Sequence, residues 1–250
     1  MVGGIKLISL NIEGHKHLER VVQFLKSEQP DVICLQEVIE PDFEFIRAAV
    51  GPEGVFAPLV LMPLGGPYVE NAEKFPWGVL LLSRLPLLET RTMLYAENSK
   101  ALQEYDPVTK DQARFNRLLL VGAIEHEGQR FTIATTHLTW TPDGNPDTLQ
   151  RRDTEAMLRV LGTMPEFVLC GDFNAPRGGE IFAAIAARYK DNIPPHYTSS
   201  LDPELHRTKG SIERMVDGLF TTPHYVAEDV SLQCGVSDHC AMVARIQRAS

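Results

Sequence analysis

The chain has 250 residues, of which 44% are hydrophobic and 23% charged, so it can bury a substantial core within one domain. Its formal net charge is −9, which argues against a protein that holds long nucleic acid through many phosphate contacts. No apolar run is long enough to span a bilayer, and the first residues lack a signal-peptide pattern. We therefore expect one domain over residues 1–250, cytoplasmic and monomeric, without membrane insertion.

The first half of the chain alternates short apolar runs with amphipathic segments. Apolar runs typical of buried strands occur at residues 5–10, 32–36 and 78–83. Apolar side chains at helical spacing predict helices over residues 17–28 and 43–50. The Gly- and Pro-rich segment 51–67 is predicted to be irregular, and the weakly patterned residues 93–112 are predicted to form a mobile loop.

The second half predicts a hairpin followed by further strand and helix alternation. Strands over residues 115–124 and 130–136 are joined by a turn at Glu127-Gly128. The remaining elements are helices over 148–161 and 180–189, a loop over 191–209, and closing strands over 215–220 and 240–246. A hairpin within such an alternation indicates an α/β fold with mixed sheets.

The cysteines give no sign of a metal or redox motif. Cys34 and Cys170 lie within apolar runs, Cys234 and Cys240 flank a polar turn, and no CxxC pair occurs. We interpret them as small buried hydrophobic side chains, which fits a reducing compartment.

The stretch from Phe167 to Pro176 combines a strand-like apolar run with polar residues at its end. Gly171 ends the predicted strand, and Asp172 and Asn174 follow two residues apart, so their side chains would point the same way in an extended chain. A carboxylate and an amide that leave a sheet together suit the activation of water beside a bound anion. The alternative is an Asx turn without chemical role, because Asp and Asn favour turns for local reasons.

Polar side chains also end other predicted strands, where sites collect on a sheet scaffold. These are Asn11, Glu37, His137, Asp217, Asp238 and His239. If the strand ends converge, their carboxylates and amide suit a hard cation such as Mg²⁺, with Glu37 as the first candidate ligand and Asn11 and Asp238 near it. The histidines then remain for phosphate contact and proton transfer. Each of these residues, taken alone, also fits an ordinary turn, rim or core position.

Six short motifs carry a resemblance to a known family. They are Asn11-Ile-Glu-Gly14, Gln36-Glu37, Thr136-His137-Leu138, Gly171-Asp172-Phe173-Asn174, Val216-Asp217-Gly218 and Ser237-Asp238-His239. Together, and in this order, they resemble the endonuclease/exonuclease/phosphatase superfamily, and residues 36–41 with Arg117 resemble its 5′-tyrosyl-DNA phosphodiesterase branch. The resemblance implies a four-layer α/β sandwich in which two mixed β-sheets pack face to face between outer helices.

The resemblance also implies a metal site and substrate contacts. Glu37 resembles the family's ligand for Mg²⁺ or Mn²⁺, with Asn11 beside it, and Asp238 resembles a further ligand of metal or water. Arg117 is a candidate phosphate contact. Glu13 stands where DNA-processing members often have Asp. Trp77 and Trp140 could form an aromatic rim for a base or a lipid, and packing is the alternative for both. Trp77 lies where abasic-site nucleases have a Tyr.

The catalytic roles follow from the same resemblance. Asp172 resembles the residue that orients or deprotonates the attacking water, and Asn174 resembles its partner that steadies the transition state. His137 and His239 resemble the two histidines that contact the scissile phosphate. Asp217 resembles the carboxylate that orients His239.

The sequence therefore predicts a divalent-metal-dependent phosphodiesterase or nuclease that acts on nucleic-acid ends or short strands by in-line attack of an activated water. Two alternatives stay open. One is a phosphomonoesterase or lipid-headgroup hydrolase, and the other is a catalytically inactive binding protein on the same fold. The intact set of Glu37, Asp172, Asn174 and His239 argues against the second.

Overall fold

The computed structural model describes residues 3–51, 53–63, 73–96 and 101–249. Within these ranges the chain forms two six-stranded sheets and four α-helices. Residues 52 and 64–67 of the predicted irregular segment, and residues 97–100 of the predicted loop, lie outside the described residues.

The first sheet has the strand order β11-β12-β1-β2-β4-β3. Its strands are β1 (Ile5–Asn11), β2 (Val32–Ile39), β3 (Glu53–Pro63), β4 (Lys74–Ser83), β11 (Tyr225–Gln233) and β12 (Ala241–Arg248). The pair β1–β2 is parallel and the other neighbouring pairs are antiparallel, so the sheet is mixed as predicted.

The second sheet has the order β5-β6-β7-β8-β10-β9. Its strands are β5 (Leu87–Ala96), β6 (Arg117–His126), β7 (Gln129–His137), β8 (Val168–Asp172), β9 (Lys190–Asp191) and β10 (Asp217–Thr221). Only β7–β8 is parallel among its strand pairs. Short 3₁₀ helices occur at Gln112–Arg114 and Pro142–Gly144.

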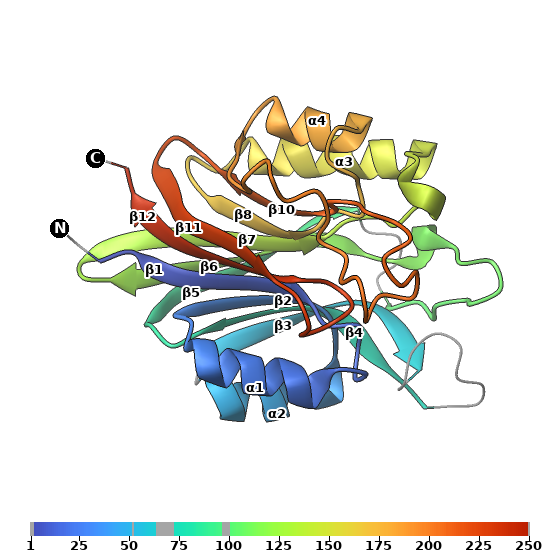
Figure 1. Cartoon of the computed structure of the whole chain (residues 1–250), viewed down its shortest axis with the longest axis horizontal. Coiled ribbons are helices and arrows are strands. Elements are labelled where there is room, and N and C mark those ends of the chain that lie inside the picture. The colour runs from blue at the N-terminus through green and yellow to red at the C-terminus, as the bar shows by residue number, and fades with distance from the viewer. Residues whose placement is uncertain (1–2, 52, 64–72, 97–100, 250) are drawn as a thin grey trace.

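Helices cover the outer faces of both sheets, as Figure 1 shows. The helices α1 (Leu18–Glu28) and α2 (Glu40–Val50) pack on the first sheet, and α3 (Thr148–Leu161) and α4 (Glu180–Ala186) pack on the second. A third apolar cluster fills the space between the two sheets. The predicted four-layer sandwich is therefore confirmed.

The apolar runs of the central strands follow from burial on both faces. In β1, Ile5 and Leu7 face the core between the sheets, whereas Ile8 and Leu10 face α1 and α2. The strands β2, β4 and β8 alternate in the same way. A strand covered on both faces needs apolar side chains at every position, which is why these strands were predicted correctly.

Four strands, β3, β5, β9 and β11, were missed or misread, and each lies at an edge of its sheet. The predicted irregular segment contains β3, whose Pro58 and Pro63 are tolerated because an edge strand has one unpaired side. The predicted loop over 93–112 overlaps β5, and β11 was not predicted at all. Both have mostly exposed or half-buried side chains and therefore lack an apolar pattern.

The interpretation of the cysteines was half correct. Cys34 and Cys170 are buried free thiols. Cys234 and Cys240, however, form a disulfide, and Cys234 is exposed. A disulfide is typical of an oxidising environment and argues against the predicted reducing compartment.

Gly171 in β8 allows close contact with β7. Its φ is +144°, and a Cβ atom here would lie 2.1 Å from the carbonyl oxygen of Thr136. We expect Gly171→Ala to lower the free energy of unfolding by about 3 kcal/mol or more, because backbone strain and a clash with backbone act together. Chemical denaturation measures this. The control is Gly128→Ala, where φ is +76° and no atom lies within 4 Å of the added Cβ; equal destabilisation of the two variants would contradict the explanation.

Candidate active site

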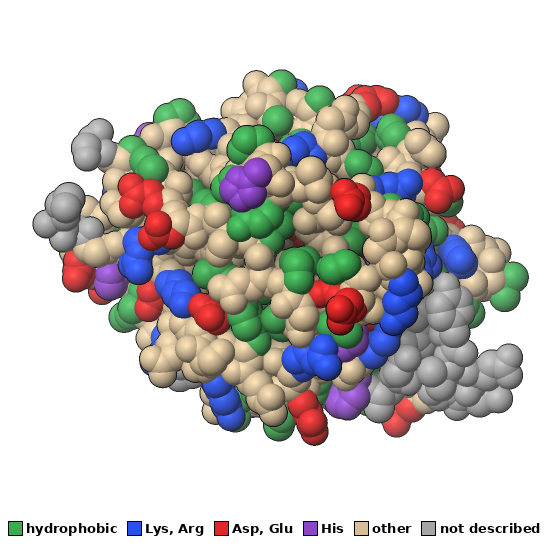
Figure 2. Space-filling model, in the orientation of Figure 1, with side chains coloured by type: hydrophobic (Ala, Val, Ile, Leu, Met, Phe, Trp, Pro, Cys, Tyr) green, Lys and Arg blue, Asp and Glu red, His purple; other side chains and the backbone are tan. Residues whose placement is uncertain are grey.

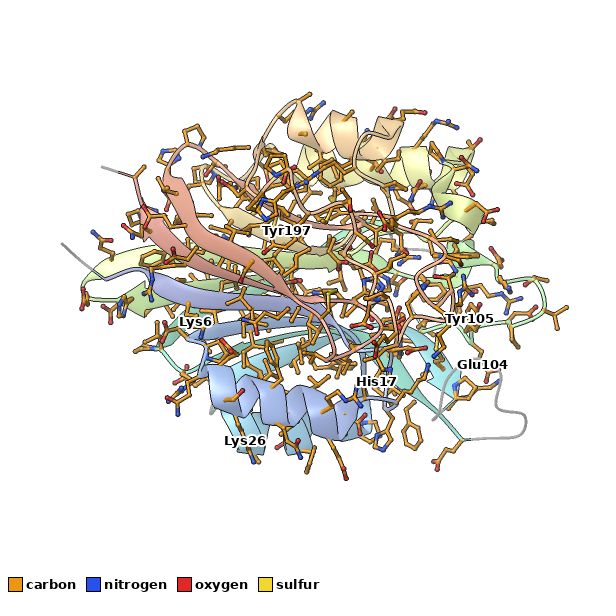
Figure 3. The ribbon with its side chains drawn as sticks, in the orientation of Figure 1. Lys6, His17, Lys26, Glu104, Tyr105 and Tyr197 are labelled. Atoms are coloured by element: carbon orange, nitrogen blue, oxygen red, sulfur yellow. A yellow bond between two sulfur atoms is a disulfide. The ribbon has the colours of Figure 1, made fainter. Side chains whose placement is uncertain are left out.

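A cavity of about 690 Å³ opens where the carboxyl ends of β1, β2, β7 and β8 meet. Tyr105, which lines it, lies toward the end of the sandwich away from the chain termini (Figure 3). The predicted residues Glu37, His137, Asp172, Asn174 and His239 all line this cavity. The structure thus brings together side chains that lie up to two hundred residues apart in the chain.

Glu37 reaches the cavity through a bulge in β2. The register against β4 shifts between Leu35 and Val38, and Glu37 has a φ of +62°. Such a bulge re-aims one side chain within a strand. The amide nitrogen of Asn11 donates to Glu37 Oε1 at 2.9 Å and to Asp172 Oδ2 at 3.1 Å, so Asn11 connects two cavity residues that belong to different sheets.

Asp172 and Asn174 form an Asx turn rather than an extended pair. Asp172 Oδ1 accepts a hydrogen bond from the Asn174 backbone N–H at 2.8 Å, and Asn174 has a φ of +50°. The predicted extended geometry was wrong, since β8 ends at Asp172. The turn nevertheless directs both side chains to the cavity. The stretch therefore forms the Asx turn that was the alternative prediction, and it also places Asp172 and Asn174 at the candidate site.

His137 lies between the Asn174 amide and two carboxylates. Its Nε2 is 2.9 Å from Asn174 Nδ2, 3.5 Å from Asp172 Oδ2 and 3.8 Å from Glu37 Oε1. The second hydrogen of the Asn174 amide goes to the Leu138 carbonyl at 3.0 Å. Among the described residues, the buried Nδ1 of His137 has no partner.

Asp217 and His239 form a buried pair across the cavity. His239 Nδ1 donates to Asp217 Oδ2 at 2.8 Å, and His239 Nε2 lies 4.0 Å from Asp172 Oδ2. Burial alone would lower the pKa of His239, but the charge of Asp217 and the hydrogen bond to it raise that pKa well above its usual value. The imidazole is therefore held as a cation that faces the site.

Asp172 is held ionised by its histidine neighbours. Burial acts to raise its pKa, but the neighbouring imidazole of His137 and the positive charge of His239 lower the pKa to about 2. An ionised carboxylate at this position can accept a hydrogen bond from water at neutral pH.

Two further carboxyl groups face the same space. Burial raises the pKa of Glu37, and burial together with the charges of Glu37 and Glu13 raises the pKa of Asp238 to about 7, against the charge of His239. Glu13 also lines the cavity, where its carboxylate pairs with Lys16 at 2.8 Å and His17 at 3.1 Å.

The predicted substrate contacts Arg117 and Trp140 differ in burial: Arg117 is buried, whereas Trp140 is half-buried. Arg117 is 1% exposed, and its guanidinium donates to the His137 carbonyl at 3.0 Å and to Gln112 Oε1 at 2.7 Å. It thus holds the backbone of His137. Trp140 is half-buried on the cavity wall, with Lys110 Nζ 6.0 Å from its ring centre.

Two further aromatic side chains lie close to the histidines of the site. The Trp77 ring lies 5.4 Å from that of His137, and the His206 ring lies 6.4 Å from that of His239. Trp77, predicted as a candidate rim residue just before the strand over residues 78–83, belongs to β4 in the structure, whereas His206 was not predicted. His206 lies within the predicted loop over 191–209, whose sequence has no periodic pattern to signal it.

A family model described as the endonuclease/exonuclease/phosphatase family matches residues 8–239. The chain belongs to this family. The resemblance of the six motifs is therefore confirmed. Members of the family are phosphoric ester hydrolases that generally use a divalent metal ion.

Relatives within the family share the fold at low identity. Drosophila melanogaster Nocturnin is 29% identical over 188 residues, a match that covers 71% of this chain and 26% of that protein. The chain thus matches about a quarter of the length of this relative. The human Nocturnin catalytic domain, solved with a bound sulfate anion, has a TM-score of 0.69 at 19% identity and covers 99% of this chain and 94% of its own.

A solved D. rerio TDP2, humanised by 14 mutations, has a TM-score of 0.65 at 17% identity, with 97% of this chain and 98% of its own covered. At this identity the likeness itself concerns the fold.

The family's metal ion fits the oxygen donors of the cavity. Burial raises the pKa of both Glu37 and Asp238, the charge of Asp172 adds to the rise at Glu37, and the charge of Glu37 adds to the rise at Asp238. A cation bound beside these carboxyl groups would favour their ionised form. Asn11 is placed differently from a ligand, since its oxygen accepts the Glu13 backbone N–H at 3.1 Å and its nitrogen faces the carboxylates. No described helix is both long and apolar enough to cross a membrane.

Proposed function

We propose that this chain hydrolyses phosphodiester bonds at nucleic-acid ends or in short strands, with the help of Mg²⁺ or Mn²⁺. The observation that carries the proposal is the convergence of seven predicted side chains at one end of the sandwich. They are Asn11, Glu37, His137, Asp172, Asn174, Asp217 and His239. No packing requirement of the strands selects these polar residues.

Each side chain has a part in an in-line attack of water on phosphorus. Asp172 accepts a hydrogen bond from the attacking water and orients it. His239, held by Asp217, donates to a phosphate oxygen on which negative charge develops, and His137 with Asn174 supports the phosphate from the other side.

A bound metal ion would add positive charge to that of the His239 imidazole. Glu37 and Asp238 would hold it, and when bound it stabilises negative charge on the phosphate oxygens. Asn11 would keep Glu37 and Asp172 in place through the two hydrogen bonds that it donates.

The cavity walls support a substrate with an aromatic group and few phosphates. The volume of about 690 Å³ is that of a small-molecule site, and Trp77, Tyr105, Phe115 and Trp140 line it. Figure 2 shows acidic and basic side chains interspersed over the visible face, without the broad basic stripe that long duplex binding requires. A strand end that enters the cavity needs no such stripe.

The test is a panel of substrates assayed with Mg²⁺ across a salt series. It contains a 5′-tyrosyl oligonucleotide, single-stranded, nicked and abasic DNA, a phosphodiester and a phosphomonoester chromogen, sphingomyelin and an inositol polyphosphate. We expect diesters to exceed monoesters, and strand ends to exceed long duplex. A preference for the phosphomonoester, sphingomyelin or inositol polyphosphate would overturn the nucleic-acid proposal, and a steep salt dependence on duplex would overturn the claim about substrate length.

Glu37→Gln keeps the shape of the side chain but removes its charge. We expect activity at limiting Mg²⁺ to fall by about 100-fold, because lost ligand contacts weaken metal sites by this order, with partial recovery in excess metal. Initial rates across a Mg²⁺ titration measure this. Glu166→Gln is the matched control, since Glu166 is partly buried but pairs with Arg248 at 2.6 Å outside the cavity. Full activity of Glu37→Gln at limiting Mg²⁺ would contradict the assignment.

Trp140→Ala tests whether the aromatic wall binds a base. We expect the KM for an oligonucleotide to rise about tenfold with kcat nearly unchanged, since stacking on an aromatic ring contributes about 1–3 kcal/mol per base. Trp140→Phe should retain most of the affinity. An unchanged KM in Trp140→Ala would show that this side chain serves packing alone.

A further inference from the structure

The backbone on both sides of His239 is fixed by one short segment, residues 200–202. The Asp202 N–H donates to the Asp238 carbonyl at 2.8 Å, and the Cys240 N–H donates to the Ser200 carbonyl at 2.7 Å. Leu201 and His239 form an antiparallel bridge between these two bonds. His239 is therefore placed by pairing with this segment before β12 begins.

The same segment fixes the partner of His239. The Ser200 hydroxyl oxygen accepts the N–H of Val216 at 3.0 Å and the N–H of Asp217 at 3.1 Å, at the start of β10. Ser200 is 0% exposed, and its own N–H donates to the Arg214 carbonyl at 3.0 Å. Ser200 thus touches the backbone next to both members of the Asp217–His239 pair.

This bridge matters because the two members come from different sheets. Asp217 begins β10 of the second sheet, whereas His239 precedes β12 of the first. The bond of 2.8 Å between them depends on how the two sheets are held at this end. Ser200 connects the start of β10 and the start of β12, because its hydroxyl binds the backbone at Asp217 and its carbonyl binds the backbone at Cys240.

We propose that Ser200 is a positioning residue for the Asp217–His239 pair. The inference rests on the proposed function of that pair in phosphate ester hydrolysis. Ser200 itself does not line the cavity, so it acts through the two residues that it holds and not through the substrate.

The test compares Ser200→Ala with Ser83→Ala. Ser83 is 1% exposed and also makes two hydrogen bonds with backbone through its hydroxyl, but it lies at the far end of β4. We expect both variants to lose similar thermal stability, while Ser200→Ala alone loses about tenfold or more in kcat with KM within about twofold, because small misplacements of reacting groups have large effects. Ser200→Thr, which keeps the hydroxyl, should recover part of kcat.

A second measurement does not depend on turnover. In a ¹H–¹⁵N correlation spectrum, the Nδ1–H of His239 should give a low-field signal, assigned by its loss in His239→Ala. A shift or broadening of this signal in Ser200→Ala supports the proposal, whereas an unchanged signal, or a kcat equal to that of Ser83→Ala, overturns it. If the wild type hydrolyses no phosphodiester, the proposed function fails but the spectrum still decides the role of Ser200.

The disulfide supports a second inference independently. Cys234 and Cys240 enclose residues 235–239, which include Asp238 and His239. Asp202, 2% exposed, binds the start of this turn through a hydrogen bond from the Gly235 N–H to its carboxylate. Cys234 is exposed and Cys240 is buried, so the disulfide is accessible from one side.

We infer that reduction of this disulfide loosens the turn and lowers activity. An external dithiol attacks the Cys234 sulfur, Cys240 leaves as a thiolate that takes up a proton, and the second thiol of the reductant releases Cys234. The disulfide gains two electrons and two protons, and the dithiol is oxidised to a cyclic disulfide. The turn then depends on its hydrogen bonds to residues 200–202 and on the bond from Arg20 to the Gly235 carbonyl.

Dithiothreitol provides the test. We expect kcat to fall about tenfold as two new thiols become titratable, and to return on oxidation, since small displacements of reacting groups suffice. The double variant Cys234→Ala, Cys240→Ala should have low activity that dithiothreitol does not change. Hydrogen exchange at residues 235–239 should rise on reduction whatever the substrate. Full activity or unchanged exchange after two thiols appear would overturn the inference.

Discussion

Asp172→Asn is expected to lower kcat by about 10³ to 10⁴, because a positioned group that accepts a proton or orients water contributes about 10² to 10⁴ and the substitution also disturbs both histidines. Asp172 Oδ2 lies 3.5 Å from His137 Nε2 and 4.0 Å from His239 Nε2, and it accepts from Asn11. Asparagine keeps the size but places no negative charge among these donors.

The control for Asp172→Asn is Asp153→Asn. Asp153 is also 1% exposed and accepts a hydrogen bond from Thr139 at 2.6 Å, but it belongs to α3 and does not line the cavity. Single-turnover and steady-state rates on a phosphodiester distinguish the two variants. Asp172→Asn with a kcat near that of the control would remove Asp172 from the reaction.

His239→Ala is expected to lower kcat by about 10³, and addition of Asp217→Asn should lower it little further. The reason is that Asp217 reaches the substrate only through His239, by the hydrogen bond of 2.8 Å to Nδ1. Residues that act as one unit are not additive, so a double-mutant cycle reports their coupling. Multiplicative losses in kcat would show that the two residues act independently.

The clustering of the candidate site residues could be predicted from sequence because they stand at strand ends in a fixed order. Asn11, Glu37 and Asp172 break apolar runs at positions where burial would select apolar side chains, and this contrast is visible without a structure. The bulge that turns Glu37 into the cavity was not predictable, because a positive φ at Glu leaves no mark on the sequence.

The missed features share a different physical origin. The edge strands β5 and β11 have half-exposed side chains, so their pairing is set by neighbours and not by an apolar pattern. Ser200 and His206 lie on a long connection whose course is fixed by hydrogen bonds to β10 and to the turn before β12. Contacts of this kind between distant segments become visible only in the folded chain.

The most direct test of the central claim is the initial rate of phosphodiester hydrolysis by the wild-type chain in Mg²⁺ and in EDTA, with Asp172→Asn measured in parallel. The structure predicts hydrolysis in Mg²⁺ that falls to background in EDTA, returns on addition of Mg²⁺ or Mn²⁺, and is absent from Asp172→Asn under both conditions. Wild-type hydrolysis that is equal in EDTA, or that persists in Asp172→Asn, would contradict a metal-dependent reaction at the cavity formed by β1, β2, β7 and β8.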